Sequence, residues 1–353
     1  MDMHKTEIVN LSGEQLKQWG RQALSICKMP DEEKEIILDV LVTTNLRGVD
    51  THGINLLPLY IERYNAFPPR PIKVEKDFAA VCMVDGGDNL GTVVSHRCME
   101  MAMEKASQFG VGVVMVYNSG HFGAAGHYTY QAAEKGYIGY CSTTALVNMP
   151  AWGGMDEIAG KNPFSISFPG DKFPVVLDIA CSVAARQKVL TARREGWKIP
   201  EGWALDKNGN PTTDPNEALE GVFLPMAEHK GIGLAMMIEL LCGCLCQRGF
   251  SIDVTNTDIL TGPQNISHMF AAIDPKRFLT KEEMDKQCAY ISEKFHNGRR
   301  RPGVDKLYLP GEFEWDEYQK RTVNGIPLAM SRVKELDAFS EKIGVAKVRD
   351  IPR

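Results

Sequence analysis

Residues 111–140, VGVVMVYNSGHFGAAGHYTYQAAEKGYIGY, decide the fold class because their hydrophobic pattern changes along the stretch. The short run VGVVMVYN is continuously apolar, which is typical of a buried strand. Small and polar residues then give a loop, and residues 124–135 favour a helix. The run YIGYCSTTA at 137–145 predicts the next strand. A strand, a loop, a helix and a second strand indicate an α/β protein.

The same alternation extends to both sides of this unit. On the N-terminal side, AAVCMVDG at 79–86 predicts a strand and residues 92–109 predict a helix. On the C-terminal side, PFSISFPG at 163–170 and FPVVLDIA at 173–180 follow each other with little helix between them. Parallel strands need a long crossover, so closely spaced strands favour a mixed sheet.

The N-terminal region is predicted to be helical. Residues 12–45 contain two segments with helical periodicity, and we expect each to open with a capping residue and an acidic first turn. Pro68, Pro69 and Pro71 then mark an extended linker, so we place a domain boundary near residue 75. A chain of 353 residues exceeds what one hydrophobic core usually supports, which favours two domains.

Composition restricts the possible function classes. Apolar residues make up 44% of the chain and charged residues 24%, as in ordinary soluble globular proteins. A net charge of -5 and only one short basic cluster, at 299–301, argue against nucleic-acid binding. No segment is apolar enough for a signal peptide or a membrane helix, so we expect a cytoplasmic protein without a membrane partner.

The nine cysteines are expected to be reduced thiols, as is usual in a cytosolic protein of this size. Cys242, Cys244 and Cys246 lie in GLAMMIELLCGCLC, within an apolar helix predicted from Lys230 to about Cys246. Alternate positions point to different sides of a helix, so we interpret these three cysteines as buried small side chains and predict no metal site.

The usual dinucleotide fingerprint, GxGxxG directly after a strand, is absent. The two most glycine-rich segments, DGGDNLG at 85–91 and NSGHFGAAGH at 118–127, have a different spacing. A nicotinamide site in this chain would therefore have a different construction.

The loop around His121 is a candidate catalytic site. Asn118, Ser119, Gly120 and Gly123 leave little side-chain bulk, so a ligand can approach the backbone closely. A histidine at the end of a strand can exchange a proton with a substrate hydroxyl or carbonyl. The alternative is a histidine that only bonds its own loop.

A second histidine occurs in RGVDTHGINLLPLY at 47–60, where helix gives way to loop. Either Thr51 or Asp50 could orient the ring of His52 through a hydrogen bond. The alternative is a local ion pair between Arg47 and Asp50, with His52 as a satisfied turn residue.

Two further segments have candidate ligand-binding groups. The strand PVVLDIACS at 174–182 ends with Asp178 and Ser182, where α/β proteins present polar groups to ligands. HKGIGLAMM at 229–237 places Lys230 at the opening of a helix, which suits a diphosphate or a carboxylate. As isolated features both are weak, because a lysine before a helix is usually only solvated.

Taken together, these motifs resemble the second type of malate/L-lactate dehydrogenase, a family that includes sulfolactate, ureidoglycolate and diketogulonate oxidoreductases and a piperideine-carboxylate reductase. The resemblance spans nearly the whole chain. The matching stretches, in order, are RGVDTHGINLLPLY, NSGHFGAAGHYTYQAAEKGYIG, GGMDEIAGKNPFSISFPG with VVLDIACS, IPEGWALDKNGNPTTDP, HKGIGLAMMIELLCG, and RPG with NGIPL.

The resemblance implies a homodimer and a fold without Rossmann topology. A mixed-sheet nicotinamide-binding domain is expected over residues 76–309, and a helical domain over residues 1–75 joined by the C-terminal helices at 310–353. It also implies NAD or NADP as the cofactor, with NAD favoured, and a small 2-hydroxy or 2-keto acid as the partner.

Residue by residue, the resemblance implies that His121 is the acid/base and His52 a second active-site histidine, which Asp178 helps to orient. Tyr60, Thr51 and Arg47 are the implied substrate contacts. The implied cofactor contacts are Lys230, Ile179, Ala180, Cys181, Ser182, Thr143, Thr144 and Ala145.

One position departs from the family pattern. Many relatives have an arginine four residues after the histidine that corresponds to His52, and it grips the substrate carboxylate through two hydrogen bonds. Here that residue is Leu56. Either another basic residue holds the carboxylate, with Arg47 and Arg186 as candidates, or the substrate differs at that end.

We therefore expect an NAD(P)-dependent oxidoreductase that interconverts a 2-hydroxy acid and its 2-keto acid. A cyclic imine carboxylate reductase of the same family and a metal-dependent hydrolase are the alternatives. A further alternative is a family member that has lost catalysis and serves as a binding or structural protein.

Overall fold

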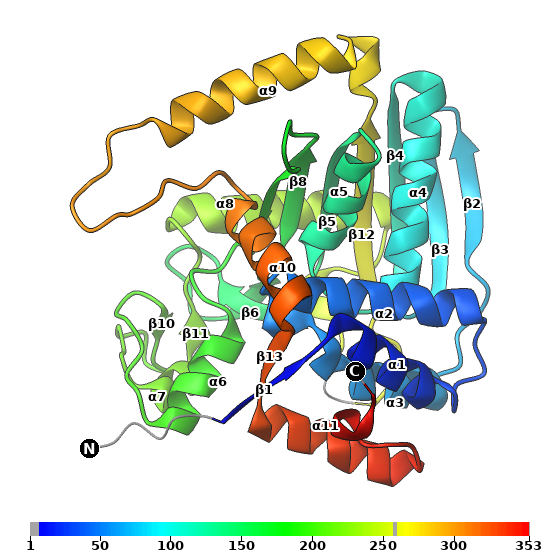
Figure 1. Ribbon diagram of the computed structural model, residues 1–353. Coiled ribbons are helices and arrows are strands. Elements are labelled where there is room, and N and C mark those ends of the chain that lie inside the picture. The colour runs from blue at the N-terminus through cyan, green and yellow to red at the C-terminus, as the bar shows by residue number, and fades with distance from the viewer. Residues whose placement is uncertain (1–6, 257–259, 353) are drawn as a thin grey trace.

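The computed structural model describes residues 7–256 and 260–352, and its centre is a seven-stranded sheet in the order β2-β3-β4-β12-β5-β8-β9 (Figure 1). The strands are β2 (Lys73–Phe78), β3 (Val81–Asn89), β4 (Val111–Ser119), β12 (Ile266–Ile273), β5 (Ile138–Thr143), β8 (Phe164–Phe168) and β9 (Val175–Ile179). Only β3 and β4 pair in parallel, and every other neighbouring pair in this sheet is antiparallel. The predicted α/β fold with a mixed sheet is therefore confirmed.

The strand β12 lies in the middle of the sheet although it comes more than a hundred residues after its neighbours. It pairs with β4 on one side and with β5 on the other. The sequence interpretation did not include this strand. It also missed the helices α6 (Arg186–Glu195) and α9 (Lys281–His296).

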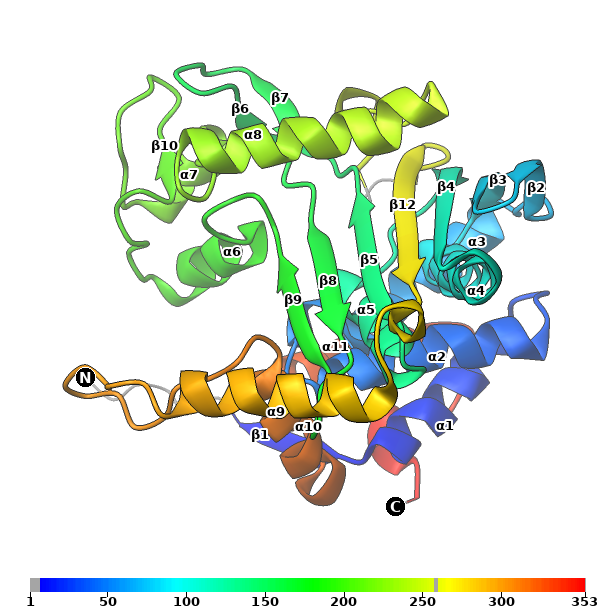
Figure 2. The ribbon, with the colours of Figure 1, turned by 90° about the horizontal axis from the view of Figure 1, so that it is seen from above.

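Helices cover both faces of the sheet. On one face α4 (Gly91–Phe109) and α5 (Ala125–Glu134) bury a core that includes Val84, Val114 and Phe270. On the other face Met115 and Tyr117 pack against Cys246, at the end of the helical segment that begins with α8 (His229–Ile238). In Figure 2, β8 and β9 run between α8 and α9.

The two chain ends form a layer of their own beside the sheet (Figure 1). The strand β1 (Ile8–Leu11) pairs antiparallel with β13 (Ile326–Ala329). The indole nitrogen of Trp19 donates to Ser340 Oγ at 2.9 Å, which ties α1 (Gly13–Leu24) to α11 (Met330–Ile343). The other helices of this layer are α2 (Asp31–Leu46), α3 (Leu57–Ala66) and α10 (Glu312–Asn324).

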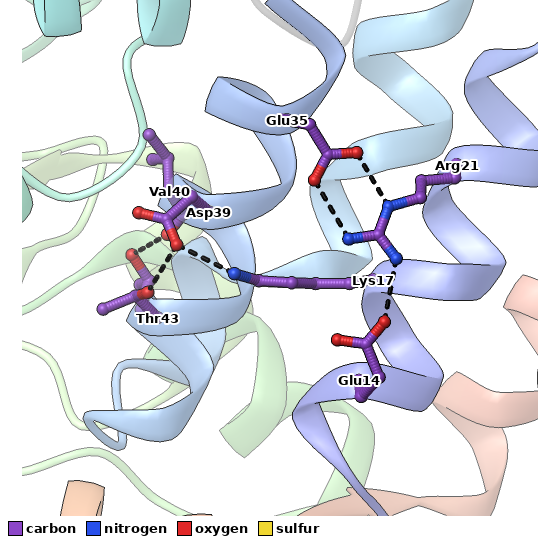
Figure 3. A network of polar contacts seen from close by, with 8 residues as sticks. Glu14, Lys17, Arg21, Glu35, Asp39, Val40 and Thr43 are labelled. Carbon is purple, nitrogen blue, oxygen red and sulfur yellow. Dashed lines mark hydrogen bonds and ion pairs between the residues drawn. The ribbon is translucent and has the colours of Figure 1, made fainter. Parts of the chain in front are cut away.

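The helices α1 and α2 begin differently. Ser12 caps α1 in a capping box with Gln15, as expected, whereas Pro30 precedes α2 without any side-chain cap. The predicted cap of the second helix was wrong, since Asp31 is already its first helical residue. Ion pairs connect the two helices: Arg21 to Glu35, and Lys17 to Asp39 (Figure 3).

The remaining elements surround one end of the sheet. They are the paired strands β6 (Val147–Pro150) and β7 (Glu157–Gly160), the paired strands β10 (Ala204–Leu205) and β11 (Val222–Phe223), and the helix α7 (Pro215–Glu220). None of the described helices is long and apolar enough to cross a membrane.

The predicted apolar helix after Lys230 is confirmed, with a wider turn of the π type at Glu239–Cys244. Cys242 and Cys246 are buried as predicted. Cys244 is exposed, so the prediction that all three thiols are buried was wrong for this residue.

Candidate active site

His121 lies in the loop between β4 and α5, where two contacts orient it. Its backbone N–H donates to Gln264 Oε1 at 2.9 Å. Its ring Nδ1 is 2.8 Å from the phenol oxygen of Tyr60, which reaches the loop from α3. Since Tyr60 occupies Nδ1 and no described residue hydrogen-bonds Nε2, Nε2 is the nitrogen available to a ligand.

The second histidine lies directly beside the first. The rings of His52 and His121 stack with their centroids 5.7 Å apart and their planes 20° apart. Nδ1 of His52 is 2.8 Å from Thr51 Oγ1, so Thr51 is the residue that orients this ring. The structure thus joins two motifs that are far apart in the sequence.

The environment keeps both rings uncharged at neutral pH. Burial lowers the pKa of His52 to about 4 and holds the pKa of His121 well below its ordinary value. The positive charge of Lys161 lowers both pKa values further. Burial also raises the pKa of the Tyr60 phenol, which therefore stays protonated.

Two adjoining cavities open beside these rings. Their shared wall consists of Thr51, His52, Gly123, Lys161, Pro163 and Ala185. We name the first the Asp178 cavity, since Asp178 lines only that one, and the second the Thr143 cavity, which is lined by Thr143 and His121. They enclose about 540 and about 440 Å³. A small-molecule site typically needs roughly 300–1,000 Å³, so each cavity has room for a ligand.

Most of the predicted contacts line one of the two cavities. Ile179, Ala180 and Arg47 line the Asp178 cavity. Thr144 and Ala145 line the Thr143 cavity.

Four predicted contacts lie elsewhere. Cys181 is buried in a small apolar core, and Ser182 Oγ donates to the carbonyl oxygen of Ala184. Tyr60 is fully buried against His121 and lines neither cavity, so the structure gives it a positioning contact in place of the expected substrate contact. Lys230 is exposed in the first turn of α8, outside the cavity walls. Its role toward the cofactor stays a prediction.

Asp178 contacts a different group from the one expected. Its Oδ2 accepts the backbone N–H of Gly126 at 2.7 Å, at the start of α5, whereas the hydrogen bond to His52 comes from Thr51. The expectation that Asp178 orients His52 is therefore corrected. Although its side chain faces the open cavity, the surrounding protein atoms displace enough water to raise the pKa of this carboxyl group to about 6.

The local ion pair between Arg47 and Asp50 does not form. Asp50 instead pairs with Arg321 of α10 at 2.7 Å. Arg47 is buried, and its guanidinium lies over the ring of Tyr130, 4.3 Å from the centroid. Asp50 therefore ties the segment between α2 and α3 to α10, while Arg47 lines the Asp178 cavity.

The sequence interpretation missed Lys161, Gln264 and His268. Lys161 follows β7 in the stretch GKNPFS, which gives no sign that its side chain lines both cavities. Gln264 and His268 lie in or just before the missed strand β12. His268 is fully buried, with Thr143 Oγ1 and Ser119 Oγ on its two ring nitrogens, so its role is structural.

Comparisons with known proteins give matches over most of the chain. A family model described as malate/L-lactate dehydrogenase matches residues 11–337. The chain is 36% identical to malate/(S)-sulfolactate dehydrogenase of Methanothermus fervidus over 325 residues, which cover 91% of this chain and 94% of that protein. It is 31% identical to ureidoglycolate dehydrogenase (NAD(+)) of Escherichia coli over 327 residues, 91% of this chain and 93% of that protein. The solved structure of sulfolactate dehydrogenase from Methanocaldococcus jannaschii has a TM-score of 0.90 at 35% identity, covering 97% of this chain and 99% of that chain.

Proposed function

This chain belongs to the malate/L-lactate dehydrogenase family and is a 2-hydroxy acid dehydrogenase, and we propose that it works with NAD and uses His121 as the acid/base. The observation that carries the role of His121 is its geometry. The ring is fixed by Tyr60 on one nitrogen, is stacked on His52, and lines the Thr143 cavity.

The cavities fit a dinucleotide together with a small acid. The loop from Thr143 to Ala145 offers hydroxyl and backbone groups on one side, and Lys161 and Arg186 offer positive charge for phosphate or carboxylate groups. When bound, the nicotinamide would supply the hydride that reduces the C2 carbon of a 2-keto acid, or accept it in the reverse direction.

The residues of this chain would control the proton. In oxidation, the uncharged ring of His121 takes the proton of the C2 hydroxyl group as that carbon loses its hydride. In reduction, the protonated ring returns it to the C2 oxygen. Tyr60 holds the ring in place throughout, and Thr51 holds the neighbouring ring of His52.

NAD is proposed because the ureidoglycolate relative carries NAD(+) in its name. The test is a titration of the purified protein with NADH and, separately, with NADPH. Tryptophan fluorescence measures the binding of each cofactor. Oxaloacetate, pyruvate, sulfopyruvate and a cyclic imine carboxylate are then added, and the absorbance of the reduced nicotinamide is recorded. We expect tighter binding of NADH and its oxidation by at least one keto acid. Absence of binding for both cofactors would overturn the proposal, and turnover of the imine alone would shift it to the reductase alternative.

We also propose that the protein is a homodimer. Large apolar side chains are exposed along α8 and the turn after it: Leu234, Met236, Met237, Leu240 and Leu245. Contiguous apolar surface of this kind usually marks a protein interface. Analytical ultracentrifugation should give twice the chain mass, and M236E/M237E should give the monomer. A monomeric wild-type protein would contradict this.

A further inference from the structure

Resting on the proposed function, we propose that Lys161 binds the carboxylate of the 2-keto or 2-hydroxy acid, in place of the arginine that is absent at position 56. Lys161 would then supply the positive charge that the sequence lacks at position 56. The carboxylate in question is the one next to the reacting C2 carbon.

The position of Lys161 supports this assignment. It lies between β7 and β8 and lines both the Asp178 cavity and the Thr143 cavity, as His52 does. Its charge acts on both His52 and His121. An anion bound to this ammonium group would therefore lie close to the imidazole that exchanges the proton.

Lys161 differs from the two arginines at this site, because no described acidic side chain acts on the pKa of its ammonium group. The charge of Arg47 is offset by the carboxylates of Glu314 and Asp178. Burial raises the pKa of Glu157, and the charge of Arg186 opposes this rise. Among residues 7–256 and 260–352, no hydrogen bond or ion pair involves the ammonium group of Lys161, and its pKa is lowered by burial first and by the charge of Arg186 second. An enclosed cation without a counter-ion favours an anionic ligand.

The backbone at Lys161 is held firmly, as a binding group requires. Its carbonyl oxygen accepts the N–H of Cys181 at 2.7 Å. The next residue, Asn162, is fully buried and bonds the backbone of Ala145 and Ala235 as well as Glu239 and Ser251. These bonds come from four separate segments, so they fix the point from which the lysine side chain extends.

Leu56 lines the Thr143 cavity together with Lys161. The wall of this cavity therefore has no positive charge at position 56 and has one at Lys161. An ammonium group is a compact charge without the planar fork of arginine, so it fixes the carboxylate less by geometry than by charge. A carboxylate paired with Lys161 also offsets the charge that lowers the pKa of His121, which favours the protonated ring needed for reduction.

The test compares a keto acid that the wild-type enzyme reduces with its uncharged methyl ester. We expect K161M to raise KM for the acid by at least about 30-fold, to change kcat much less, and to remove most of the preference for the acid over the ester. K161R should keep part of that preference, and K161M/L56R should regain about 10-fold in kcat/KM. K172M, in an exposed turn outside both cavities, should behave like the wild type.

Two results would overturn the proposal. The first is that K161M or K161Q, shown to be folded by its circular dichroism spectrum, prefers the acid over the ester as strongly as the wild type does. The other is an effect of K161M mainly on the Kd of NADH, which would assign the lysine to a cofactor phosphate. Failure of the dehydrogenase function itself would be visible separately, as a wild-type enzyme that reduces none of the keto acids.

Discussion

The imidazole of His52 lies almost parallel to that of His121, with 5.7 Å between ring centroids and 20° between the planes. Two rings this close cannot both hold a proton without strong repulsion, because the charge of one lowers the pKa of the other. The pair therefore holds one proton at most near neutral pH. Tyr60 fixes the ring of His121 and Thr51 fixes the ring of His52, so separate contacts hold the two rings in this arrangement.

Removing the hydroxyl group of Tyr60 should impair catalysis more than substrate binding. Y60F loses the bond to His121 Nδ1, so the ring is held less firmly against the substrate. We expect kcat to fall about 10-fold with KM nearly unchanged. Y64F is the matched control, since the Tyr64 hydroxyl donates to the Lys28 carbonyl on the outside of the helical layer. Equal values of kcat for the two variants would rule out a role for Tyr60 in positioning His121.

The buried histidines should make the protein less stable in mild acid. Burial lowers the pKa of His52 and His127 to about 4 and that of His268 to about 3. The unfolded chain, with an ordinary pKa of about 6.5, binds more protons between those values, so the free energy of unfolding falls as pH drops through this window. Asp178 acts in the opposite direction, because its raised pKa of about 6 stabilises the folded state at low pH and this contribution is lost as pH rises.

Urea unfolding at about pH 7.5 and about pH 5 measures this effect. Each fully buried histidine contributes up to about 1.4 kcal/mol per pH unit, and H268Q should have a shallower dependence than the wild type. A free energy of unfolding that stays constant over this interval would contradict the assignment of uncharged buried rings.

Asn162 should be important for stability as well as for substrate binding. N162A removes hydrogen bonds to Ala235 and Glu239 and leaves the buried Glu239 carboxylate with fewer partners. The backbone at Asn162 also has a positive φ of 32°, which asparagine tolerates better than alanine. We expect a loss of about 3 kcal/mol in the free energy of unfolding. The exposed turn residue Asn208 provides the control, since N208A should change it by less than about 0.5 kcal/mol.

The alternation of apolar runs and helical segments was enough to predict the fold class. It located β3, β4, β5, β8 and β9 to within a few residues, because each is a short apolar run bounded by turns. It did not predict β12, since a local pattern gives no information about a strand that inserts between two earlier ones. The division into two domains and the cytoplasmic location stay predictions.

The candidate site was partly predictable for the same reason. His121 and His52 lie in loops with unusual composition, so the sequence alone drew attention to them. That they stack, and that Tyr60 bonds His121, depends on how α3 packs against the loop after β4. Lys161 was missed because a lysine between two strands is usually solvated, and only the tertiary structure encloses it.

The acid/base role of His121 is tested by rapid-mixing measurement of hydride transfer from NADH to the preferred keto acid in the wild type, H121Q and the control H96Q, a half-buried residue of α4 that lines neither cavity. His121 as acid/base predicts a rate for H121Q about 100-fold to 10,000-fold lower than that of the wild type, with the Kd of NADH and the circular dichroism spectrum retained and H96Q unaffected. Hydride transfer by H121Q at the wild-type rate would contradict the role of His121 as acid/base.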